Sequence, residues 1–362
     1  MGLGKTLQAI AFVVSEYEKK PRPTLIIAPT SLLYNWQAEI RKFAPQATTC
    51  IVSGTPSERR ASAREFASCQ FVITSYGLLR RDIELYVDYD FSYCFIDEAQ
   101  HIKNPNTINA KAVKRIHADC FFALTGTPLE NTLIELWSIF DFIMPGYLYS
   151  RHKFRKMYEL PIIKEESKGA LESLLRHIRP FILRRLKSQV MSELPNKIES
   201  YMVSELEPQQ KLLYSAYAMK AKNEIDVLAE SGGMEKNRIK ILAIITRLRQ
   251  LCCHPSLFVE NFTGNSGKLE MLKEIVEDAI QSGHRLLIFS QFTSMLKIIS
   301  AELLKIGIEH FYLDGNTKSD ERFAMVNAFN AGGNDVFLIS LKAGGTGLNL
   351  TGADMVIHYD PW

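Results

Sequence analysis

The sequence predicts an α/β fold: two domains, each a parallel β-sheet flanked by helices, with a helical insertion between them. In the first part of the chain, short apolar runs rich in β-branched and aromatic residues alternate with helical patterns. The same scheme returns in the last part, whereas the middle carries long amphipathic patterns without clear strands. We therefore expect a first domain over residues 1–145, a helical insertion over 146–266 and a second domain over 267–362.

The strands predicted in the first domain lack the alternation of a half-buried strand, which indicates burial on both faces. They cover residues 25–28, 71–73, 93–96 and 121–124. A helix is predicted to begin at the Gly-Lys-Thr sequence of residues 4–6, because an apolar stripe with helical spacing follows it. This stripe comprises Leu7, Ile10, Ala11 and Val14. Strands joined by helices imply a parallel sheet with right-handed crossovers.

The second domain repeats this pattern, and the middle of the chain does not. The predicted strands of the second domain cover residues 286–289, 311–313, 336–339 and 355–357. Two apolar stripes in the middle predict packed helices; they comprise Leu171, Leu174, Leu175 and Ile178, then Ile241, Ile244, Ile245 and Leu248. The Ser-Gly-Gly sequence of residues 231–233 predicts an exposed turn between helices.

Composition and charge narrow the class of protein without identifying a partner. The 362 residues are 46% hydrophobic and 23% charged, as is usual in globular proteins. No apolar run approaches the length of about 18 residues needed to span a bilayer, and the N-terminus does not resemble a signal peptide. We therefore expect a cytoplasmic protein without a membrane partner. Because the formal net charge is only +3, a DNA-binding surface must be a local basic patch.

The sequence Gly4-Lys5-Thr6 at the start of a predicted helix matches the second half of a phosphate-binding loop. In such loops, N–H groups at the helix N-terminus hold phosphate, the lysine reaches the β- and γ-phosphates, and the hydroxyl binds Mg²⁺. Three residues recur by chance, so this signal is weak by itself. The first glycine of the full pattern would fall before Met1.

Polar residues follow two other predicted strands. Asp97 and Glu98 come directly after residues 93–96; an acid there can hold Mg²⁺, and a neighbouring Glu can deprotonate an attacking water. Thr125 and Thr127 follow residues 121–124, where a plain Gly-Pro turn is the alternative interpretation. Because ligands bind beyond the carboxyl ends of parallel strands, we expect these motifs to form one site.

The strings GLGKT, DEAQ and LTGTPLEN, in this order, resemble motifs I, II and III of the superfamily-two helicase-like ATPases. Further strings narrow the resemblance to the SWI/SNF family of DNA translocases, bacterial type, over essentially the whole chain. These strings are LIIAPTSLLYNW, ITSY, RPFILRR, LRQLCCHP, FSQF, KAGGTGLNL and the final DPW. The resemblance implies two RecA-like P-loop domains with a helical insertion. Gln100 stands where many relatives have His, and we expect no loss of activity because both side chains are polar.

The resemblance also implies ATP and Mg²⁺ as cofactors, with Thr6 and Asp97 as metal ligands and Glu98 as general base. The implied nucleotide-binding residues are Gly2, Gly4, Lys5, Thr6 and Asp97, with Gly345 and Gly347 from the second domain. The residues implied to couple hydrolysis to domain motion are Gln100, Thr125, Gly126 and Thr127.

Double-stranded DNA is the implied partner, contacted through its phosphate backbone and therefore with little sequence preference and a strong dependence on salt. The implied DNA-contacting residues are Pro29, Thr30, Ser31, Thr74, Ser75, Ser290, Gln291 and Asn349. Gly344, like the two glycines that follow it, would let the backbone approach the cleft. For Arg184 and Arg185, a solvated basic face is as good an interpretation as a phosphate or interdomain contact.

The function implied is an ATP-dependent double-stranded DNA translocase that remodels protein–DNA complexes, nucleoid-associated if bacterial, with a DNA-bound protein as a further candidate partner. Because part of the first motif and the family's last, arginine-bearing motif fall outside the chain, we expect a fragment truncated at both ends that is weak or inactive alone. Alternatively, Met1 is a genuine start and the protein is degenerate. Two other functions stay open: a strand-separating helicase, and a non-catalytic DNA-binding scaffold with a relic nucleotide fold.

Overall fold

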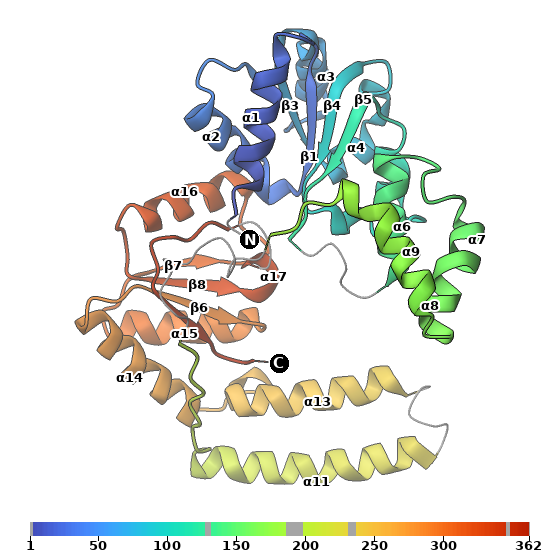
Figure 1. Ribbon diagram of the computed structural model, residues 1–362. Helices are drawn as coiled ribbons and strands as arrows, with labels where there is room; N and C mark the ends of the chain where they lie inside the picture. Colours follow the sequence, from blue (N-terminus) through green and yellow to red (C-terminus); the bar gives the residue numbers. More distant parts are fainter. Residues whose placement is uncertain (1–2, 127–131, 186–197, 231–236, 345–347, 362) are drawn as a thin grey trace. The chain divides into compact units, whose positions relative to one another are not determined.

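The computed structural model describes residues 3–126, 132–185, 198–230, 237–344 and 348–361. In it the chain forms two compact units, Met1–Asn196 and Lys197–Trp362, which we call the first and second units (Figure 1). Each contains a parallel sheet with helices on both faces, so the predicted α/β class is confirmed. Within the described ranges, no helix is long and apolar enough to cross a membrane.

The described part of the first unit contains a five-stranded sheet in the order β2-β3-β1-β4-β5, with every neighbouring pair parallel. Its strands are β1 (Thr24–Ala28), β2 (Thr49–Ile51), β3 (Phe71–Ser75), β4 (Asp90–Ile96) and β5 (His117–Ala123). Four of them were predicted. The edge strand β2 was missed because it has three residues and buries only Cys50, so it leaves no apolar run in the sequence.

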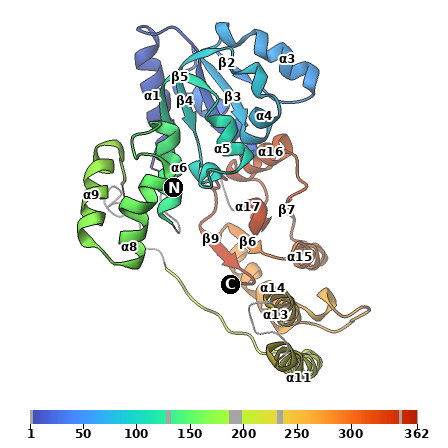
Figure 2. The same cartoon turned by 90° about the vertical axis from the view of Figure 1, so that its right-hand side faces the viewer.

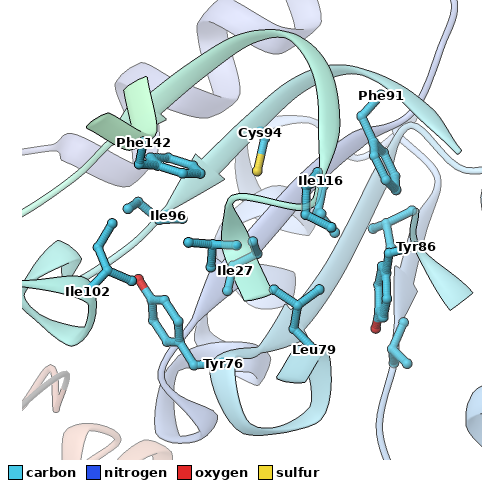
Figure 3. Close-up of a cluster of buried hydrophobic side chains, with 14 of the residues drawn as sticks. Ile27, Tyr76, Leu79, Tyr86, Phe91, Cys94, Ile96, Ile102, Ile116 and Phe142 are labelled. Carbon is cyan, nitrogen blue, oxygen red and sulfur yellow. The ribbon is translucent and has the colours of Figure 1, made fainter. Parts of the chain in front are cut away.

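Two layers of helices cover this sheet, and the alternation of side chains along β1 shows why. Leu25 and Ile27 belong to the core on one face, whereas Ile26 and Ala28 belong to the core on the other. The first core is drawn in Figure 3. Helices α1 (Lys5–Tyr17) and α2 (Leu33–Phe43) cover the second core; α3 (Pro56–Arg64), α4 (Tyr76–Arg81), α5 (Ile108–Val113) and α6 (Leu133–Ile143) cover the first. Short 3-10 turns lie at Thr30–Leu32, Phe66–Ser68, Ile83–Leu85 and Ala99–Ile102.

Helix α1 begins at Lys5, as predicted, but it buries a different face from the predicted stripe. Ala9, Ile10 and Val13 are buried against the sheet, whereas Leu7 and Val14 are exposed. Residues 9–14 read Ala-Ile-Ala-Phe-Val-Val, which is apolar all round the helix. Spacing alone therefore could not choose the buried face.

A small helical group extends the first unit. It comprises α7 (Arg151–Phe154), a π-helical turn (Arg155–Glu159), α8 (Leu160–Lys164), α9 (Lys168–Ile178) and a 3-10 turn (Arg179–Phe181). Its core includes Trp137 from α6 and Leu174 and Ile178 from α9. Helix α6 is buried on both sides. Ile139 and Phe142 pack on the sheet core, while Leu136, Trp137 and Phe140 face this group.

The described part of the second unit contains a four-stranded parallel sheet in the order β7-β8-β6-β9. Its strands are β6 (Leu286–Ser290), β7 (His310–Leu313), β8 (Val336–Ser340) and β9 (Met355–His358), all of them predicted. Helices α14 (Gly267–Gln281) and α15 (Thr293–Lys305) cover one face, and α16 (Ser319–Asn330) and α17 (Leu341–Gly344) the other.

Two long helices complete this unit: α11 (Pro208–Glu230) and α13 (Arg238–Cys253), followed by a 3-10 turn (Pro255–Leu257). They lie side by side in Figures 1 and 2. The buried Gln210 side chain at the start of α11 donates to the Leu251 carbonyl near the end of α13, 2.8 Å away. The predicted turn at residues 231–233 lies outside the described residues. Helices predicted in the middle of the chain thus belong partly to each unit, and the predicted domain boundaries stay predictions.

Candidate functional site

The motifs of the first unit meet at the carboxyl edge of its sheet. Strand β1 lies between β3 and β4, and the register pairs Ile27 with Ile96 and Ile96 with Ala123. The residues that follow β1, β4 and β5 therefore lie at one level. The Asp97 N–H donates to the Ile27 carbonyl at 2.8 Å, and the Ala99 N–H donates to the Leu124 carbonyl at 3.0 Å.

Helix α1 begins directly after a glycine with a left-handed backbone. Gly4 has φ 72° and ψ 26°, a left-handed conformation that disfavours any residue with a Cβ. Lys5 and Thr6 follow in the first turn and are half-buried. The N–H groups of a first turn have no partner within the helix, which makes a helix N-terminus suited to bind an anion.

Asp97 is buried and held at each of its polar groups. One carboxylate oxygen, Oδ2, accepts from the Trp36 indole N–H at 3.0 Å, and Oδ1 accepts from the Glu98 N–H at 2.9 Å. The Tyr76 hydroxyl donates to the Asp97 carbonyl at 2.7 Å. The pKa of the Asp97 carboxyl is raised, chiefly because burial disfavours its charge. The bonds from Trp36 and Glu98 oppose this rise in pKa, the Glu98 charge adds to it, and the Lys5 charge lowers it.

Glu98, Gln100 and Thr125 form a line of side-chain contacts beside Asp97. Glu98 is buried and has φ 50° and ψ 60°, a left-handed backbone that is uncommon for this residue. The Gln100 amide Nε2 donates to Glu98 Oε2 at 2.8 Å, and its Oε1 accepts from the Thr125 hydroxyl at 3.2 Å. The structure thus joins the segments after β4 and β5 through the residues that the sequence singled out.

The first unit's residues fit Mg²⁺ held together with a nucleotide. Asp97 and Thr6 offer hard oxygen ligands, and Lys5 is close enough to affect the Asp97 charge. Within the described ranges, no cluster of three or more His, Cys, Asp or Glu side chains could hold a metal alone. This agrees with the way Mg²⁺ binds in such sites, through one or two carboxylates together with substrate phosphates.

Trp36 and Tyr76 are the two residues at this site that sequence reasoning missed. Trp36 lies on α2 and is 1% exposed; Tyr76 begins α4 and stacks on the His101 ring, 4.9 Å between centroids. Burial lowers the pKa of His101, and the Glu98 charge opposes this. Both missed residues lie within strings that carried the family resemblance, LLYNW and ITSY, but those strings were not tied to Asp97.

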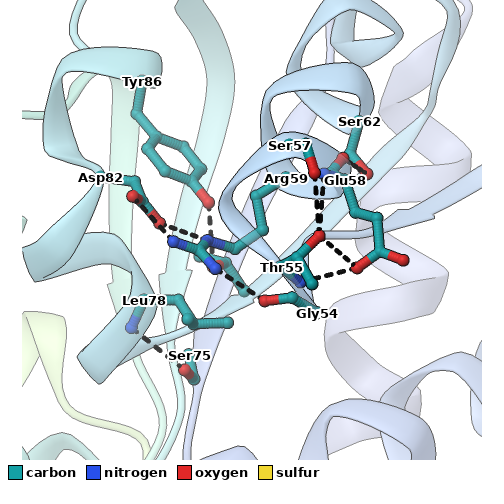
Figure 4. A network of polar contacts seen from close by, with 11 residues as sticks. Gly54, Thr55, Ser57, Glu58, Arg59, Ser62, Ser75, Leu78, Asp82 and Tyr86 are labelled. Carbon is teal, nitrogen blue, oxygen red and sulfur yellow. Dashed lines mark hydrogen bonds and ion pairs between the residues drawn. The ribbon is translucent and has the colours of Figure 1, made fainter.

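Thr74 and Ser75, predicted to touch DNA, lie inside the first unit instead. The buried Thr74 hydroxyl accepts from the Tyr86 hydroxyl at 2.9 Å, and the buried Ser75 hydroxyl accepts from the Leu78 N–H as the cap of α4. Figure 4 shows the surrounding network, in which the Arg59 guanidinium donates to the Asp82 carboxylate and to a backbone carbonyl. Both hydroxyl groups therefore serve internal contacts in this geometry. The structure does not present them to a ligand.

After β1, the predicted DNA contacts differ in exposure. Pro29 is buried, Thr30 is exposed and Ser31 is half-buried. Arg184 and Arg185 are exposed at the end of the described part of this unit.

In the second unit the predicted residues serve mixed roles. Ser290 is buried and its hydroxyl donates to Asp360 Oδ2 at 3.0 Å, so a direct contact of this hydroxyl with DNA does not fit this geometry. Gln291 is exposed and its Oε1 accepts from the Arg249 guanidinium at 3.0 Å. Asn349 is exposed.

Gly344 lies against side chains of its own sheet. A Cβ there would come within 2.7 Å of both Ile339 and Phe289 side chains, which explains the glycine by packing. The remaining predicted site residues lie outside the described residues; they are Gly2, Thr127, Gly345 and Gly347. Gly126 is exposed at the end of the segment after β5.

Comparisons with known proteins agree with this geometry. A model of the SNF2-related domain matches residues 1–257, and a model of the helicase conserved C-terminal domain matches residues 267–362. The chain is 39% identical to an uncharacterized ATP-dependent helicase of Mycoplasma pneumoniae, covering 100% of this chain and 34% of the relative. It is 39% identical to YwqA of Bacillus subtilis (100% and 40%) and 35% identical to the ISWI chromatin-remodeling complex ATPase CHR17 of Arabidopsis thaliana (99% and 35%). The chain thus spans about a third to two fifths of the length of these relatives.

Among solved structures, the chain is similar to the Sulfolobus solfataricus SWI2/SNF2 ATPase core in complex with double-stranded DNA. The TM-score is 0.52 at 35% identity, covering 100% of this chain and 76% of that chain. The same core domain in a second structure gives a TM-score of 0.51 at 36% identity. The resemblance inferred from GLGKT, DEAQ and LTGTPLEN is therefore confirmed, and both parallel sheets have counterparts in one architecture. The chain belongs to the SNF2-related family, with the RecA-like fold of the SWI2/SNF2 ATPase core.

Proposed function

We propose that this chain is the motor core of a DNA-dependent ATPase that moves along double-stranded DNA and remodels protein–DNA complexes. The observation that carries the proposal is the unbroken line of polar contacts from Asp97 and Glu98 through Gln100 to Thr125. Relatives named as ATP-dependent helicases and chromatin-remodeling ATPases support it, as does the similar core that was solved with double-stranded DNA.

Nucleotide binding is assigned to the start of α1 and the end of β4. The N–H groups of the first turn and the Lys5 ammonium bind the β- and γ-phosphates. The Thr6 hydroxyl and the Asp97 carboxylate would hold Mg²⁺, which would offset the phosphate charge. Gly4 permits the left-handed turn that leads into the helix.

Hydrolysis is assigned to Glu98 as general base. A water oxygen attacks the γ-phosphorus, the bond to the β-phosphate oxygen breaks, and Glu98 accepts the proton of the water. Gln100 donates to Glu98 Oε2 and so orients the Glu98 carboxylate. The other oxygen of this carboxylate, Glu98 Oε1, then accepts the proton of the water. Burial of Glu98 and Asp97 keeps bulk water from competing at this position.

The coupling of hydrolysis to domain motion is assigned to the contact between Gln100 and Thr125. A change at Glu98 during hydrolysis alters the hydrogen bond made by Gln100, which in turn holds the segment after β5 through Thr125. DNA is contacted through its phosphates, by the exposed Thr30 and the half-buried Ser31 in the first unit and by Gln291 and Asn349 in the second. If the protein is bacterial, we expect it to be associated with the nucleoid.

The test is ATP hydrolysis with and without double-stranded DNA, for this chain and for any longer gene product that contains it. Glu98→Gln is expected to lower the DNA-stimulated rate by about 10²–10⁴-fold, the usual contribution of a general base. Glu159→Gln is the matched control, because this glutamate pairs with Arg151 in the helical group of the first unit. A rate that DNA does not stimulate, or that Glu98→Gln leaves intact, would contradict the motor assignment and favour the scaffold.

An assay of strand separation distinguishes a translocase from a strand-separating helicase. We expect the active protein to displace the third strand of a DNA triplex, which requires movement along the duplex, without releasing a strand of the duplex itself. Release of a duplex strand at a comparable rate would instead identify a strand-separating helicase. Loss of affinity between low and moderate salt, with little difference among DNA sequences, would support phosphate-based binding.

A further inference from the structure

Trp36 connects two parts of the nucleotide site that are far apart in the sequence. It lies on the buried face of α2 with Leu33 and Ile40, in the same core as Ile10 and Val13 of α1. Its ring is 1% exposed, yet its one polar group does not bond a backbone carbonyl. The indole N–H donates instead to Oδ2 of Asp97, 61 residues later in the chain.

The surroundings of Asp97 show what this bond adds. Its backbone is fixed by β1 through the Ile27 carbonyl and by α4 through the Tyr76 hydroxyl. Among the described residues, two donate to its carboxylate: the N–H of the next residue, Glu98, and the Trp36 indole. The Trp36 bond therefore ties the carboxylate to a separate helix. Since a carboxylate has about four acceptor positions, two stay available for a metal or water.

A simpler explanation is that any buried indole N–H needs an acceptor. Trp137 in the same unit shows that a backbone carbonyl is sufficient, because its indole N–H donates to the Tyr149 carbonyl at 3.1 Å. Trp36 instead uses the one acid that directly follows β4 and lies beside Glu98. This hydrogen bond restricts the rotation of the Asp97 carboxylate, which the proposed nucleotide site requires.

We propose that Trp36 is a positioning residue, whose indole N–H holds the Asp97 carboxylate in the orientation that binds the Mg²⁺ of Mg·nucleotide. The proposal rests on the proposed function and deepens it at the same site. Partners that orient a metal ligand typically change metal affinity by about 10–100-fold when they are removed. Trp36 thereby ties α2, which follows β1, to the acid at the end of β4.

The test compares Trp36→Phe with Trp137→Phe, which removes a similar buried indole and its hydrogen bond away from Asp97. ADP binding is measured by calorimetry with Mg²⁺ and again with EDTA. Mg²⁺ should increase the affinity for ADP, and we expect this increase to be about 10–100-fold smaller in Trp36→Phe. The affinity for ADP in EDTA should be unchanged. Trp137→Phe should keep both affinities. Equal losses with and without Mg²⁺, or no loss, would overturn the proposal and leave Trp36 a structural residue.

A second measurement needs no substitution at the site. In the wild-type protein with ADP, Mn²⁺ should broaden the Trp36 indole N–H resonance beyond detection, since its nitrogen lies 3.0 Å from Asp97 Oδ2; Trp137→Phe and Trp362→Phe identify the other two indole signals. A sharp Trp36 signal would reject the proposal even if Trp36→Phe folds poorly. If a longer wild-type gene product that contains this chain binds no Mg·ADP at all, the proposed function fails together with the role of Trp36. If wild type binds normally and Trp36→Phe behaves likewise, only the role of Trp36 fails.

Discussion

Replacing Gln100 with Met keeps the size of the side chain and removes both of its hydrogen bonds. The bond to Glu98, at 2.8 Å, involves a charged partner, and such bonds contribute about 1.5–3 kcal/mol. If the bond acts in the transition state, its loss lowers the rate by about 10–100-fold, since about 1.4 kcal/mol corresponds to a factor of ten. The longer bond from Thr125, 3.2 Å between neutral groups, contributes about 0.5–1.5 kcal/mol, or about 2–10-fold.

The assay is DNA-stimulated ATP hydrolysis of Gln100→Met, Thr125→Val and the double variant. Since neither side chain reaches the phosphates in the proposed scheme, we expect kcat to fall while KM for ATP is unchanged. The double variant should be no slower than Gln100→Met, because both changes interrupt one line of contacts. Gln100→His should keep most of the activity, as a polar ring can bond both neighbours.

Two results would refute this reasoning. If the losses in the double variant multiply, Gln100 and Thr125 act independently and no line of contacts couples β4 to β5. If Thr125→Val is as active as wild type, Gln100 serves only to orient Glu98.

Three further predictions concern stability, measured by hydrogen exchange so that each unit is observed separately. Asp82→Asn should destabilise the first unit by about 1.5–3 kcal/mol, because the buried Arg59 guanidinium loses its charged acceptor and keeps the Gly54 carbonyl; the double variant with Arg59→Met should recover part of this. Arg285→Met should destabilise the second unit by about 2–5 kcal/mol, because this guanidinium binds four backbone carbonyls; full protection after the change would contradict it. Burial lowers the pKa of His254, so the unfolded state binds more protons and the second unit should lose stability as pH falls from about 7 to 5. His254→Asn, which keeps an acceptor for Ser256, should weaken this pH dependence.

The strands were predictable because they are buried on both faces. Residues 25–28 and 336–339 read as continuous apolar runs, and in the structure every residue of β1 and β8 is buried. The same criterion fails for β2, where only one side chain enters the core. It also cannot orient α1, whose apolar residues surround the helix. Hydrophobic pattern therefore predicts elements well where burial is complete and poorly where a face must be chosen.

The proximity of Asp97 and Thr125 was predictable from their positions at the ends of predicted parallel strands. Asp97 and Thr125 follow neighbouring strands, and parallel strands bring their carboxyl ends together, so their proximity follows from topology. The direction of a side chain at a strand end does not follow, because neighbouring residues point to opposite faces. Thr74 and Ser290 therefore turned out to be internal, and Trp36 was missed because its contact with Asp97 depends on how α2 packs.

An aspartate that follows a strand need not be a ligand, as the second unit shows. Asp360 comes after β9 and is buried like Asp97, and it ties down the end of the neighbouring strand β6. Its Oδ2 accepts from the Ser290 hydroxyl, and both oxygens accept from the Gln291 N–H. These donors all come from one strand end, so the carboxylate fastens β9 to β6. Asp97 instead draws its donors from α2 and its own loop and has a lysine and a glutamate nearby. Similar burial therefore yields a structural acid in one sheet and a candidate metal ligand in the other, and the origin of the donors makes the difference.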